Sequence, residues 1–521
     1  MAWTLTHVSA RYAVVTLEGG GLYDLQAPRE LTLAGGGETR SLTARQVVTC
    51  LFGLRPDTAY RLADGEDILD FSTLHEAFTL DVRDFGARGD GTQDDTAAIQ
   101  AAILACPPQS RVLLPAGVWR VTHLFLRDHL RLELAQGATL LGSYDKAHLP
   151  VLPGMLQSWD EETEYNLGTW EGNPLPCYAA LLTGLHARDV EIYGPGKVEG
   201  SGAPDTWWKD AKQIKGVFRP RLMFLNRCED VTVAGLTFCN SPSWNLHPYF
   251  SSRLKFLGVT VLAPWDSPNT DGFDPESCRD VLLSGARFSL GDDCIAVKSG
   301  KIYMGSAYRT PCENLRITHC LMENGHGAVT IGSEMAGGVR GLTVEDCLFR
   351  HTDRGLRIKT RRGRGEQAVV EDVYFHRLVM EGVKAPFTAN CFYFCDPDGK
   401  SDYVQCREKQ PVDERTPEIR SLRFADIRCR DAQAAAACFL GLPEKPIGLI
   451  EMTGVEVSFA QDPQPMAPVM CCGAEPCVRG GIQAENVATL RLTDVTLHGV
   501  AGEKLELRGV EKLEVTGGNV Q

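Results

Sequence analysis

Hydrophobic positions of this chain alternate with polar ones in short runs that recur along most of its length. Strand-like units such as DVTVAGLTF at Asp230 and DVLLSGARFSL at Asp280 are each followed by a turn, and copies continue to KLEVTGG at Lys512. Aligned on their central turns, the copies from Gly235 onward lie 23, 27, 34, 27 and 31 residues apart. Such short units leave no room for a long helix, and a repeat at this period indicates a stacked architecture. The pattern predicts a parallel β-helix over residues 79–521.

Residues 1–78 carry a different pattern. Tyr12 to Leu17 reads YAVVTL and is followed by a Glu-Gly-Gly-Gly turn, as expected for antiparallel strands joined by glycine turns. The segment from Leu54, LRPDTAY, resembles the LxPxTxY segment of fibronectin type III domains, in which the tyrosine packs at a sandwich corner. We therefore expect an all-β chain: a small fibronectin type III-like β-sandwich over residues 1–78, followed by the β-helix over 79–521.

Four polar clusters interrupt the apolar strands at intervals of about one coil. The intervals are 21 residues from Asp271 to Asp292, 33 from Asp293 to His326, and 33 from His326 to Lys359. Stacked coils lie about 4.8 Å apart, so the four clusters can lie on one face as adjacent rungs. The clusters are Asn269-Thr270-Asp271-Gly272, Gly291-Asp292-Asp293-Cys294, Gly325-His326-Gly327 and Arg357-Ile358-Lys359.

Three carboxylates held this close cannot all ionise freely, so at least one should have a raised pKa and stay protonated near neutrality. Cleavage of a glycosidic bond requires this combination: one carboxylic acid protonates the leaving oxygen, and another carboxylate attacks or activates water. Arg357 and Lys359 lie two positions apart on a predicted strand, so they face the same way and can hold a substrate carboxylate.

Each cluster has a simpler interpretation when it is taken alone. Asp-Gly pairs commonly form turns, GHG is typical of a tight turn, and Arg-x-Lys on a strand is typical of a solvated face. GDDC could also bind magnesium or calcium through its carboxylates. The occurrence of all four clusters at coil-length intervals favours one functional site, for which we expect no metal and no cofactor.

The four clusters resemble, in order, the four motifs of the polygalacturonase family, glycoside hydrolase family 28. The stretch DVRDFGARGDGTQDD from Asp81 is similar to the start of the catalytic domain of that family, so the resemblance covers about residues 79–521. A fibronectin-like domain at the N-terminus resembles the layout of bacterial exo-polygalacturonases. The matching stretches are NTDGFD from Asn269, GDDCIAVKSG from Gly291, GHGAVTIGSE from Gly325 and RGLRIKT from Arg354.

This resemblance implies a right-handed parallel β-helix that hydrolyses α-1,4-galacturonosidic bonds with inversion. It gives Asp292 the role of general acid, and it gives Asp271 and Asp293 that of activating the attacking water. His326 would support protonation of the acid, and Arg357 with Lys359 would bind the galacturonate carboxylate.

Three further residues are assigned to substrate binding on weaker grounds. Asn269 opens the first motif. Tyr393 would correspond to an aromatic residue that lines the cleft in this family, although packing in the core explains it equally well. His247 lies one coil before Asp271 and could line a subsite.

Long insertions at about 143–180 and 396–417 could obstruct one end of a cleft, which favours an exo-acting enzyme that releases galacturonate from chain ends. Endo action, and hydrolysis of rhamnogalacturonan or xylogalacturonan, are alternatives within the family. A pectate lyase shares the β-helix but requires calcium and leaves an unsaturated product. A non-catalytic carbohydrate-binding β-helix would bind without turnover.

The net charge and the cysteine content indicate which classes of partner and which cellular compartment to expect. The formal net charge of −14 disfavours nucleic acid as a partner, because phosphate binding needs a broad basic surface. No apolar stretch approaches the ~20 residues of a membrane span, and the N-terminus lacks a signal-peptide pattern. Eighteen cysteines without an export signal indicate reduced thiols. We expect a cytoplasmic enzyme that acts on galacturonan or oligogalacturonides. The sequence pattern indicates neither a monomer nor a particular oligomer.

Overall fold

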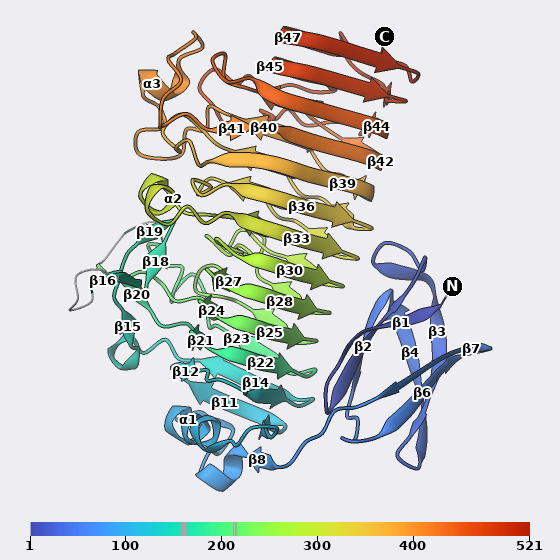
Figure 1. Ribbon diagram of the computed structural model, residues 1–521, viewed down its shortest axis with the longest axis vertical. Coiled ribbons are helices and arrows are strands. Elements are labelled where there is room, and N and C mark those ends of the chain that lie inside the picture. The colour runs from blue at the N-terminus through green and yellow to red at the C-terminus, as the bar shows by residue number, and fades with distance from the viewer. Residues whose placement is uncertain (1, 158–163, 212, 214–215, 521) are drawn as a thin grey trace.

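The computed structural model describes residues 2–157, 164–211, 213 and 216–520. Most of them form a column of stacked coils, which stands upright in Figure 1 with the first strands of the chain packed beside it. Successive coils pair in parallel. The architecture is the expected all-β, right-handed parallel β-helix preceded by a small β-sandwich. None of the described helices is long and apolar enough to cross a membrane.

Each coil contributes short strands to three faces of the column. Sheet 1 consists of β8 (Thr79–Asp81), β10 (Arg111–Leu114), β13 (Arg131–Leu134), β22 (Arg188–Tyr193), β25 (Glu229–Ala234), β28 (Ser252–Leu257), β30 (Arg279–Ser284), β33 (Cys312–Thr318), β36 (Val339–Glu345), β39 (Val369–Glu381), β41 (Glu418–Ile419), β42 (Ser421–Ala432), β44 (Ile447–Phe459), β45 (Gly480–Thr493) and β47 (Leu505–Thr516). Sheet 2 consists of β9 (Asp90–Asp94), β11 (Gly117–Val121), β14 (Ala138–Gly142), β23 (Lys197–Glu199), β26 (Thr237–Cys239), β29 (Thr260–Leu262), β31 (Arg287–Ser289), β34 (Leu321–Glu323), β37 (Leu348–Arg350) and β46 (Thr496–His498).

Sheet 3 carries the polar clusters. Between its fourth and fifth strands, Phe273 bridges Leu246 on one side and Ile295 on the other, so the stack is continuous there. Its strands are β12 (Leu124–Phe125), β21 (Leu182–Leu185), β24 (Met223–Asn226), β27 (Leu246–Tyr249), β32 (Ile295–Val297), β35 (Val329–Gly332), β38 (Arg354–Lys359), β40 (Ala385–Asn390) and β43 (Ala435–Leu440). Some long strands belong to two faces: β45 and β47 begin in sheet 3, and β39, β42 and β44 continue into sheet 2.

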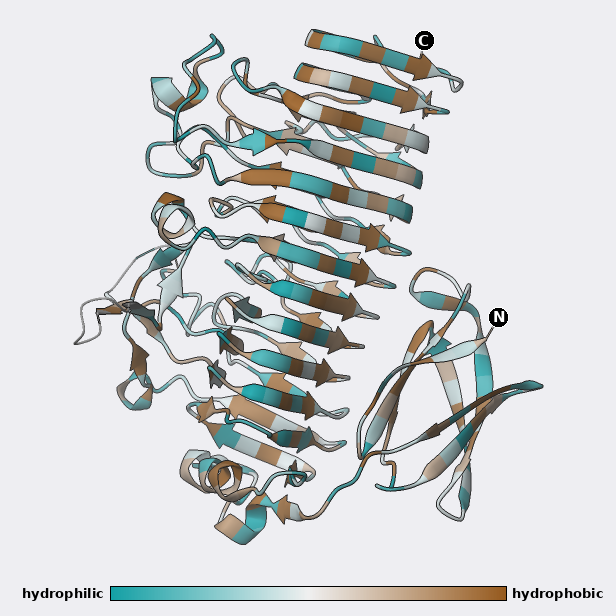
Figure 2. Cartoon of the chain, viewed as in Figure 1, coloured by the Kyte–Doolittle hydropathy of each residue, from teal (hydrophilic) through white to brown (hydrophobic). Residues whose placement is uncertain are grey.

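The interior of the column is built from equivalent apolar side chains stacked coil on coil, and burial of each contributes roughly 1.5–3 kcal/mol. Thirteen of the eighteen cysteines are buried and all eighteen are free thiols, as expected; the cytoplasmic location stays a prediction. Figure 2 shows hydrophobic and hydrophilic positions alternating along the strands of sheet 1. One buried row in register runs through Val231, Leu254, Val281, Leu315, Leu342 and Val373.

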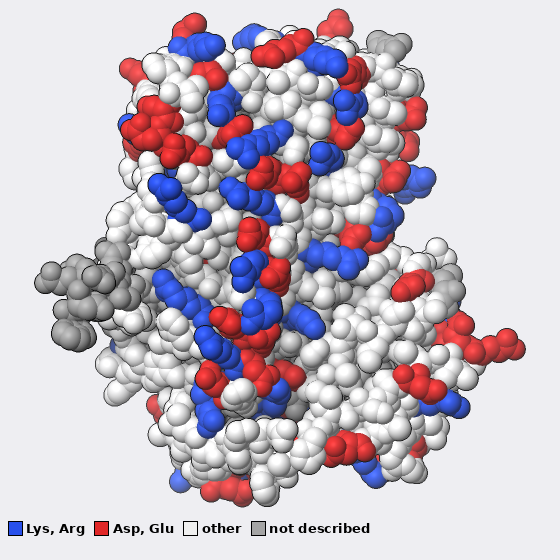
Figure 3. All heavy atoms as spheres, viewed as in Figure 1, with Lys and Arg blue, Asp and Glu red and all other residues white. Residues whose placement is uncertain are grey.

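The outer surface of sheet 1 carries interleaved charges rather than a patch of one sign. Figure 3 shows basic and acidic side chains alternating over these strands. Arg253 pairs with Asp230 of the preceding coil at 2.7 Å, and Arg377 pairs with Asp346 at 2.7 Å. Exposed pairs of this kind contribute little stability, and they leave no broad basic surface on this face.

A left-handed residue near the start of these sheet 1 strands explains why the sequence repeat begins with Asp, Asn or Gly. Asp230, Asp280, Asn314 and Gly341 occupy equivalent positions, the second or third residue of their strands, with φ of 54°, 57°, 56° and 63°. These residue types adopt the left-handed conformation most readily. At the start of the column, the helix α1 (Thr96–Ala105) covers the first coil.

The first strands form two antiparallel sheets around a separate apolar core. Tyr60 packs in this core, and its hydroxyl accepts a hydrogen bond from the Arg55 backbone N–H at 2.8 Å, as expected for a sandwich corner. The division into domains at residue 78 stays a prediction. One sheet contains β1 (Trp3–Val8), β2 (Tyr12–Leu17) and β5 (Val48–Phe52), and the other contains β3 (Asp24–Gly35), β4 (Glu38–Gln46), β6 (Ala59–Asp64) and β7 (Asp67–Ser72).

The strand β5 docks on the column at three glycines of consecutive coils. Val48 contacts Gly285, Cys50 contacts Gly258 and Phe52 contacts Gly235. A Cβ added at any of these glycines would lie within 3.0 Å of the β5 side chain opposite it. The glycines therefore allow a close, apolar contact between the N-terminal sheet and the column.

Both predicted insertions leave the column on the side of sheet 3. The insertion at 143–180 forms small hairpins, although its residues 158–163 lie outside the described residues. The insertion at 396–417 contains α3 (Asp402–Gln405), and the helix α2 (Ile302–Tyr308) lies between the insertions in Figure 1. The short elements of the first insertion are η2 (Lys146–His148), β15 (Val151–Leu152), β16 (Met155–Gln157), β17 (Glu164–Asn166), β18 (Thr169–Trp170), β19 (Asn173–Pro174) and β20 (Cys177–Tyr178).

Candidate active site

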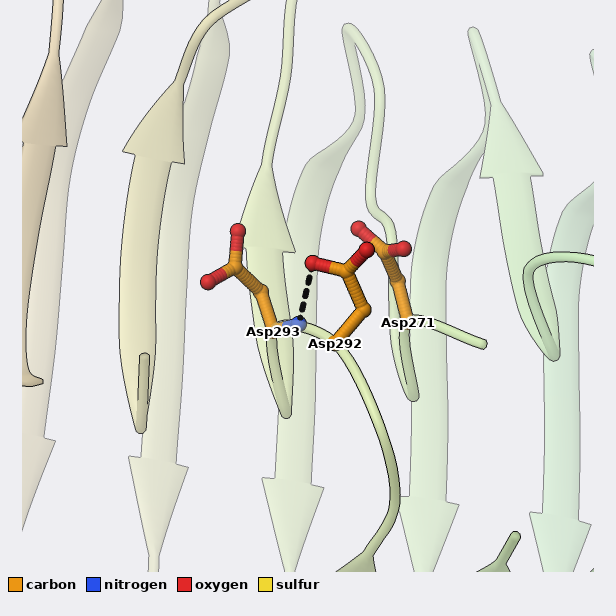
Figure 4. Close-up of side chains that lie close together, drawn as sticks. All are labelled: Asp271, Asp292 and Asp293. Atoms are coloured by element: carbon orange, nitrogen blue, oxygen red, sulfur yellow. Dashed lines mark hydrogen bonds between the residues drawn. The ribbon is translucent and has the colours of Figure 1, made fainter. Parts of the chain in front are cut away.

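The three predicted aspartates meet on sheet 3. Asp271 lies on the coil that bridges β27 and β32, and Asp292 and Asp293 directly precede β32. One carboxylate oxygen from each lies within 4.8 Å of the others. Figure 4 shows Asp292 turned toward Asp271, while the carboxylate of Asp293 points away from both. The coil-length spacing therefore does bring these side chains together.

Asp271 and Asp292 form a repelling pair of carboxylates. The pKa of Asp271 is raised well above its usual value, first by burial and then by the charges of Asp292 and Asp274. Asp292 is partly exposed, and its Oδ1 accepts the backbone N–H of Asp293 at 2.9 Å. A proton on either member of the pair relieves the repulsion, so the pair can hold one proton between them.

Asp293 has a different environment because two cations bind it. Its Oδ1 accepts from Arg357 Nη1 at 2.9 Å and its Oδ2 accepts from Lys359 Nζ at 2.9 Å. Burial alone would raise the pKa of Asp293, but Lys359 and Arg357 outweigh burial and lower it. Asp293 is thus a buried carboxylate whose ionised form is favoured and which holds Arg357 and Lys359 in place.

His326 lies beside Asp292. Its Nδ1 is 3.5 Å from Asp292 Oδ1, and the imidazole is half exposed. The hydrogen bond with Asp292 raises the pKa of His326. This contact places a proton donor next to Asp292, where the resemblance required one.

These side chains surround a cavity of about 240 Å³. Asp293 and His247 are the two predicted site residues that do not line it. Tyr393 lines the cavity although its side chain is largely buried, and its part in substrate binding stays a prediction. Asn269 is held by Arg219, whose Nη2 donates to its Oδ1 at 2.7 Å. The predicted residues that line the cavity are Asn269, Asp271, Asp292, His326, Arg357, Lys359 and Tyr393.

The expectation that His247 binds substrate is wrong. Its side chain is 0% exposed, and its Nε2 lies 2.9 Å from Glu276 Oε2. The rings of Phe224, Trp244 and Tyr249 pack around it. On a β-helix the side chains of a strand alternate between interior and surface. His247 is in register with Phe224 and points away from the interior of the column, but the aromatic cluster under the first insertion buries it. Trp244, three residues before His247, lines the cavity instead.

Sequence reasoning missed several charged residues of the cavity wall. Lys298 and Glu334 lie within the stretches GDDCIAVKSG and GHGAVTIGSE, a few residues beyond the clusters, and both line the cavity. Their position after β32 and β35 was the available signal, because adjacent rungs of one sheet bring such residues together. Glu171 and Asp396, which also line the cavity, come from the two insertions and had no local signal.

The two insertions are joined across the cavity by Lys301. Its Nζ lies 4.0 Å from Glu171 Oε2 and 3.4 Å from Asp396 Oδ1. Asp396 is also bound by Arg361 at 2.9 Å and by Arg364. Arg361 and Arg364 therefore anchor the second insertion and are buried rather than part of a solvated loop.

The aspartate cluster is also the one group of carboxylates, cysteines and histidines among the described residues with the spacing of a metal site. Both oxygens of Asp293 already accept hydrogen bonds from cations. A divalent ion would thus meet two positive neighbours, which disfavours the magnesium or calcium interpretation of GDDC.

The sequence profile of glycosyl hydrolases family 28 matches residues 147–468, and a profile described as rhamnogalacturonase A/epimerase, pectate lyase-like, matches residues 79–154. The chain is 32% identical over 403 residues to a probable polygalacturonase of Vitis vinifera, an alignment that covers 76% of this chain and 77% of the relative. It is 32% identical over 311 residues to an endo-polygalacturonase of Pectobacterium carotovorum subsp. carotovorum, which covers 57% and 72%.

Solved structures show the same architecture. An exopolygalacturonase from Thermotoga maritima superposes with a TM-score of 0.62 and 25% sequence identity over 75% of this chain and 90% of that chain. Both exo-acting and endo-acting enzymes are thus among the similar proteins.

Proposed function

The chain belongs to glycoside hydrolase family 28, and from that premise we propose that it hydrolyses the α-1,4-galacturonosidic bonds of galacturonan or oligogalacturonides. The observation that carries the proposal is the pair Asp271 and Asp292, which face one cavity and can share a proton. Arg357 and Lys359 at the same cavity provide positive charge for a uronate carboxylate.

In this reaction Asp292 donates its proton to the leaving oxygen, and Asp271 accepts a proton from the attacking water. Loss of the proton from one carboxylate stabilises a proton on the other, so the pair can alternate between the two states. His326 supplies a hydrogen bond to Asp292 in both. Asp293 was expected to act as a second base, but its buried position and its two cations support a role in holding Arg357 and Lys359.

Inversion at the anomeric carbon is proposed from family membership. Inverting enzymes typically hold their two carboxyl groups roughly 6.5 to 9.5 Å apart, which leaves room for water. Here the closest carboxylate oxygens of the cluster lie within 4.8 Å. The separation alone therefore does not support inversion, and the anomer released in the first minutes of reaction, observed by proton NMR, decides it.

Exo action is supported by the wall that the insertions form. Glu171 and Asp396 line the cavity from two separate insertions, and Lys301 joins them. A cavity of about 240 Å³ bounded by residues of both insertions suits the terminal unit of a chain better than a long run of units.

The purified protein should release saturated monogalacturonate from trigalacturonate and from polygalacturonan from the first time points. The physical reason is that a small cavity bounded by two insertions favours a chain end. Anion-exchange chromatography of the products measures this. Early mixed oligomers would make the enzyme endo-acting, a product that absorbs in the ultraviolet would make it a lyase, and binding without turnover would make it a binding protein.

Lys301→Ala should loosen the wall, because Glu171 and Asp396 would lose the cation between them. We expect the share of products longer than one unit from polygalacturonan to rise severalfold, while kcat on trigalacturonate stays within about threefold of wild type. A matched control is Lys400→Ala, an exposed lysine of the second insertion that lies over the Phe394 ring. An unchanged product pattern in Lys301→Ala would remove Lys301 from the explanation of exo action.

A further inference from the structure

Lys298 is a buried cation beside the proposed catalytic carboxylates. Its Nζ lies 3.1 Å from Glu334 Oε2, 3.6 Å from Asp274 Oδ1 and 3.9 Å from Asp271 Oδ2. The side chain is 3% exposed, and the ammonium lies 4.5 Å from the centre of the Trp244 ring. Lys298 thus connects Asp271 to two carboxylates for which the reaction has no use.

The stacking of coils creates this group of charges. Lys298 forms a backbone β-bridge with Glu276 on the preceding coil, and Glu334 follows β35 on the next coil. Each coil therefore contributes one or two charged residues at the same height. Several titratable or charged groups act on Asp271, Asp274 and Lys298, and Lys359 of β38 acts on Glu334. The groups are His247 of β27, Arg219 and Arg221 before β24, Glu171 of the first insertion, Asp274 and Glu276 of the preceding coil, Asp292 and Asp293 before β32, and Glu334 after β35.

Burial of so many carboxylates would force protons onto them unless a cation compensates. Burial raises the pKa of Asp274 to about 7 even though Lys298 opposes the shift. In the described part of the chain, neither oxygen of Asp274 has a hydrogen-bond partner. Burial would lower the pKa of Lys298, but Glu334, Asp274 and Asp271 outweigh it, so the ammonium stays charged. Lys298 is therefore the compensating charge for this group.

We propose that Lys298 is a positioning residue that favours the state in which Asp271 is ionised and the shared proton is on Asp292. Its ammonium compensates Asp274 and Glu334, so these carboxylates do not draw a second proton into the site. Lys298 acts through Asp271 rather than on the reacting bond. This role rests on the proposed hydrolysis, because it presumes that Asp271 is the base.

Two single variants should shift the pH dependence in opposite directions. Lys298→Met removes the cation, so protons bind the carboxylates more tightly and the acidic limb of the kcat/KM profile on trigalacturonate should move up by about one pH unit, a tenfold loss of rate below the limb. Glu334→Gln removes a neighbouring anion of the same size, so the limb should move down. The double variant removes one charge of each sign and should return the limb toward wild type. Lys298→Arg keeps the charge and should keep the limb.

Opposite shifts that cancel in the double variant are the expected result. A limb that stays in place in both single variants, or moves the same way in both, would overturn the role of Lys298. A higher KM with unchanged kcat and limb in Lys298→Met would make Lys298 a substrate-binding residue instead. Glu334→Gln is isosteric and provides the test if circular dichroism shows that Lys298→Met does not fold. A wild type without turnover contradicts the proposed function, whereas an active wild type with unmoved limbs contradicts only this inference.

Discussion

Asp292→Asn should lower kcat on trigalacturonate by about 10²- to 10⁴-fold, the usual contribution of a positioned general acid. The amide has nearly the same shape as the carboxylic acid but cannot donate its proton to the leaving oxygen. KM should stay within about threefold, because Arg357 and Lys359 still line the cavity. Steady-state kinetics with reducing-sugar detection measures both constants.

An aryl galacturonide distinguishes the acid from the base. A leaving group of low pKa departs without protonation, so Asp292→Asn should lose much less activity on it than on trigalacturonate, whereas Asp271→Asn should lose activity on both. Equal losses on the two substrates in Asp292→Asn would contradict its assignment as the acid. Asp266→Asn is the matched control, since Asp266 is exposed and lies three residues before Asn269.

Asp293→Asn should lower the free energy of unfolding by about 3–5 kcal/mol, the cost of breaking a buried ion pair by removing one partner. The variant leaves Arg357 and Lys359 facing each other without the carboxylate that binds both. Because the two cations then lose their positions at the cavity, KM should rise as well. Urea denaturation followed by tryptophan fluorescence measures the stability.

The stability that Asp293 contributes should decrease at low pH and not at high pH. The folded-state pKa of Asp293 is lowered, so its contribution to stability is fully present above the unfolded pKa of about 3.9 and is lost only as the pH falls toward the folded value. The gap between wild type and Asp293→Asn should therefore be constant from about pH 5 to 8. Asp230→Asn, which breaks the exposed pair with Arg253, should leave the denaturation midpoint nearly unchanged. An equally small change in Asp293→Asn would contradict the buried-pair interpretation.

The coil repeat and the core of the site could be predicted from the sequence because both depend on spacing. An interval of one coil places Asp271 beside Asp292, and alternation along β38 places Arg357 and Lys359 on the same side. The motif stretches then gave the order of the rungs along sheet 3. In a stacked architecture, the spacing of residues along the sequence directly determines which side chains are neighbours on adjacent coils.

Other features could not be predicted because they depend on contacts between coils and insertions. His247 was placed on the correct coil, but the sequence did not show that the aromatic cluster under the first insertion buries it. The partners of Asp293 and of Lys298 depend on which of several nearby charges lie at the same height. Glu171, Lys301 and Asp396 meet only through the path of two insertions, which no repeat describes.

The contact between β5 and the column matches two different spacings: that of side chains along a strand and that of successive coils. Side chains that point the same way along a strand lie roughly 6.7 Å apart, whereas coils lie about 4.8 Å apart. Val48, Cys50 and Phe52 meet three successive coils one by one, so β5 must cross them at roughly 45°. The coil from Gly258 to Gly285 is the one that carries Asp271. If a whole coil were gained or lost here, the β5 side chains would lie opposite other residues than these glycines. The contact with β5 therefore constrains the number of coils in this part of the column, which includes the coil of Asp271.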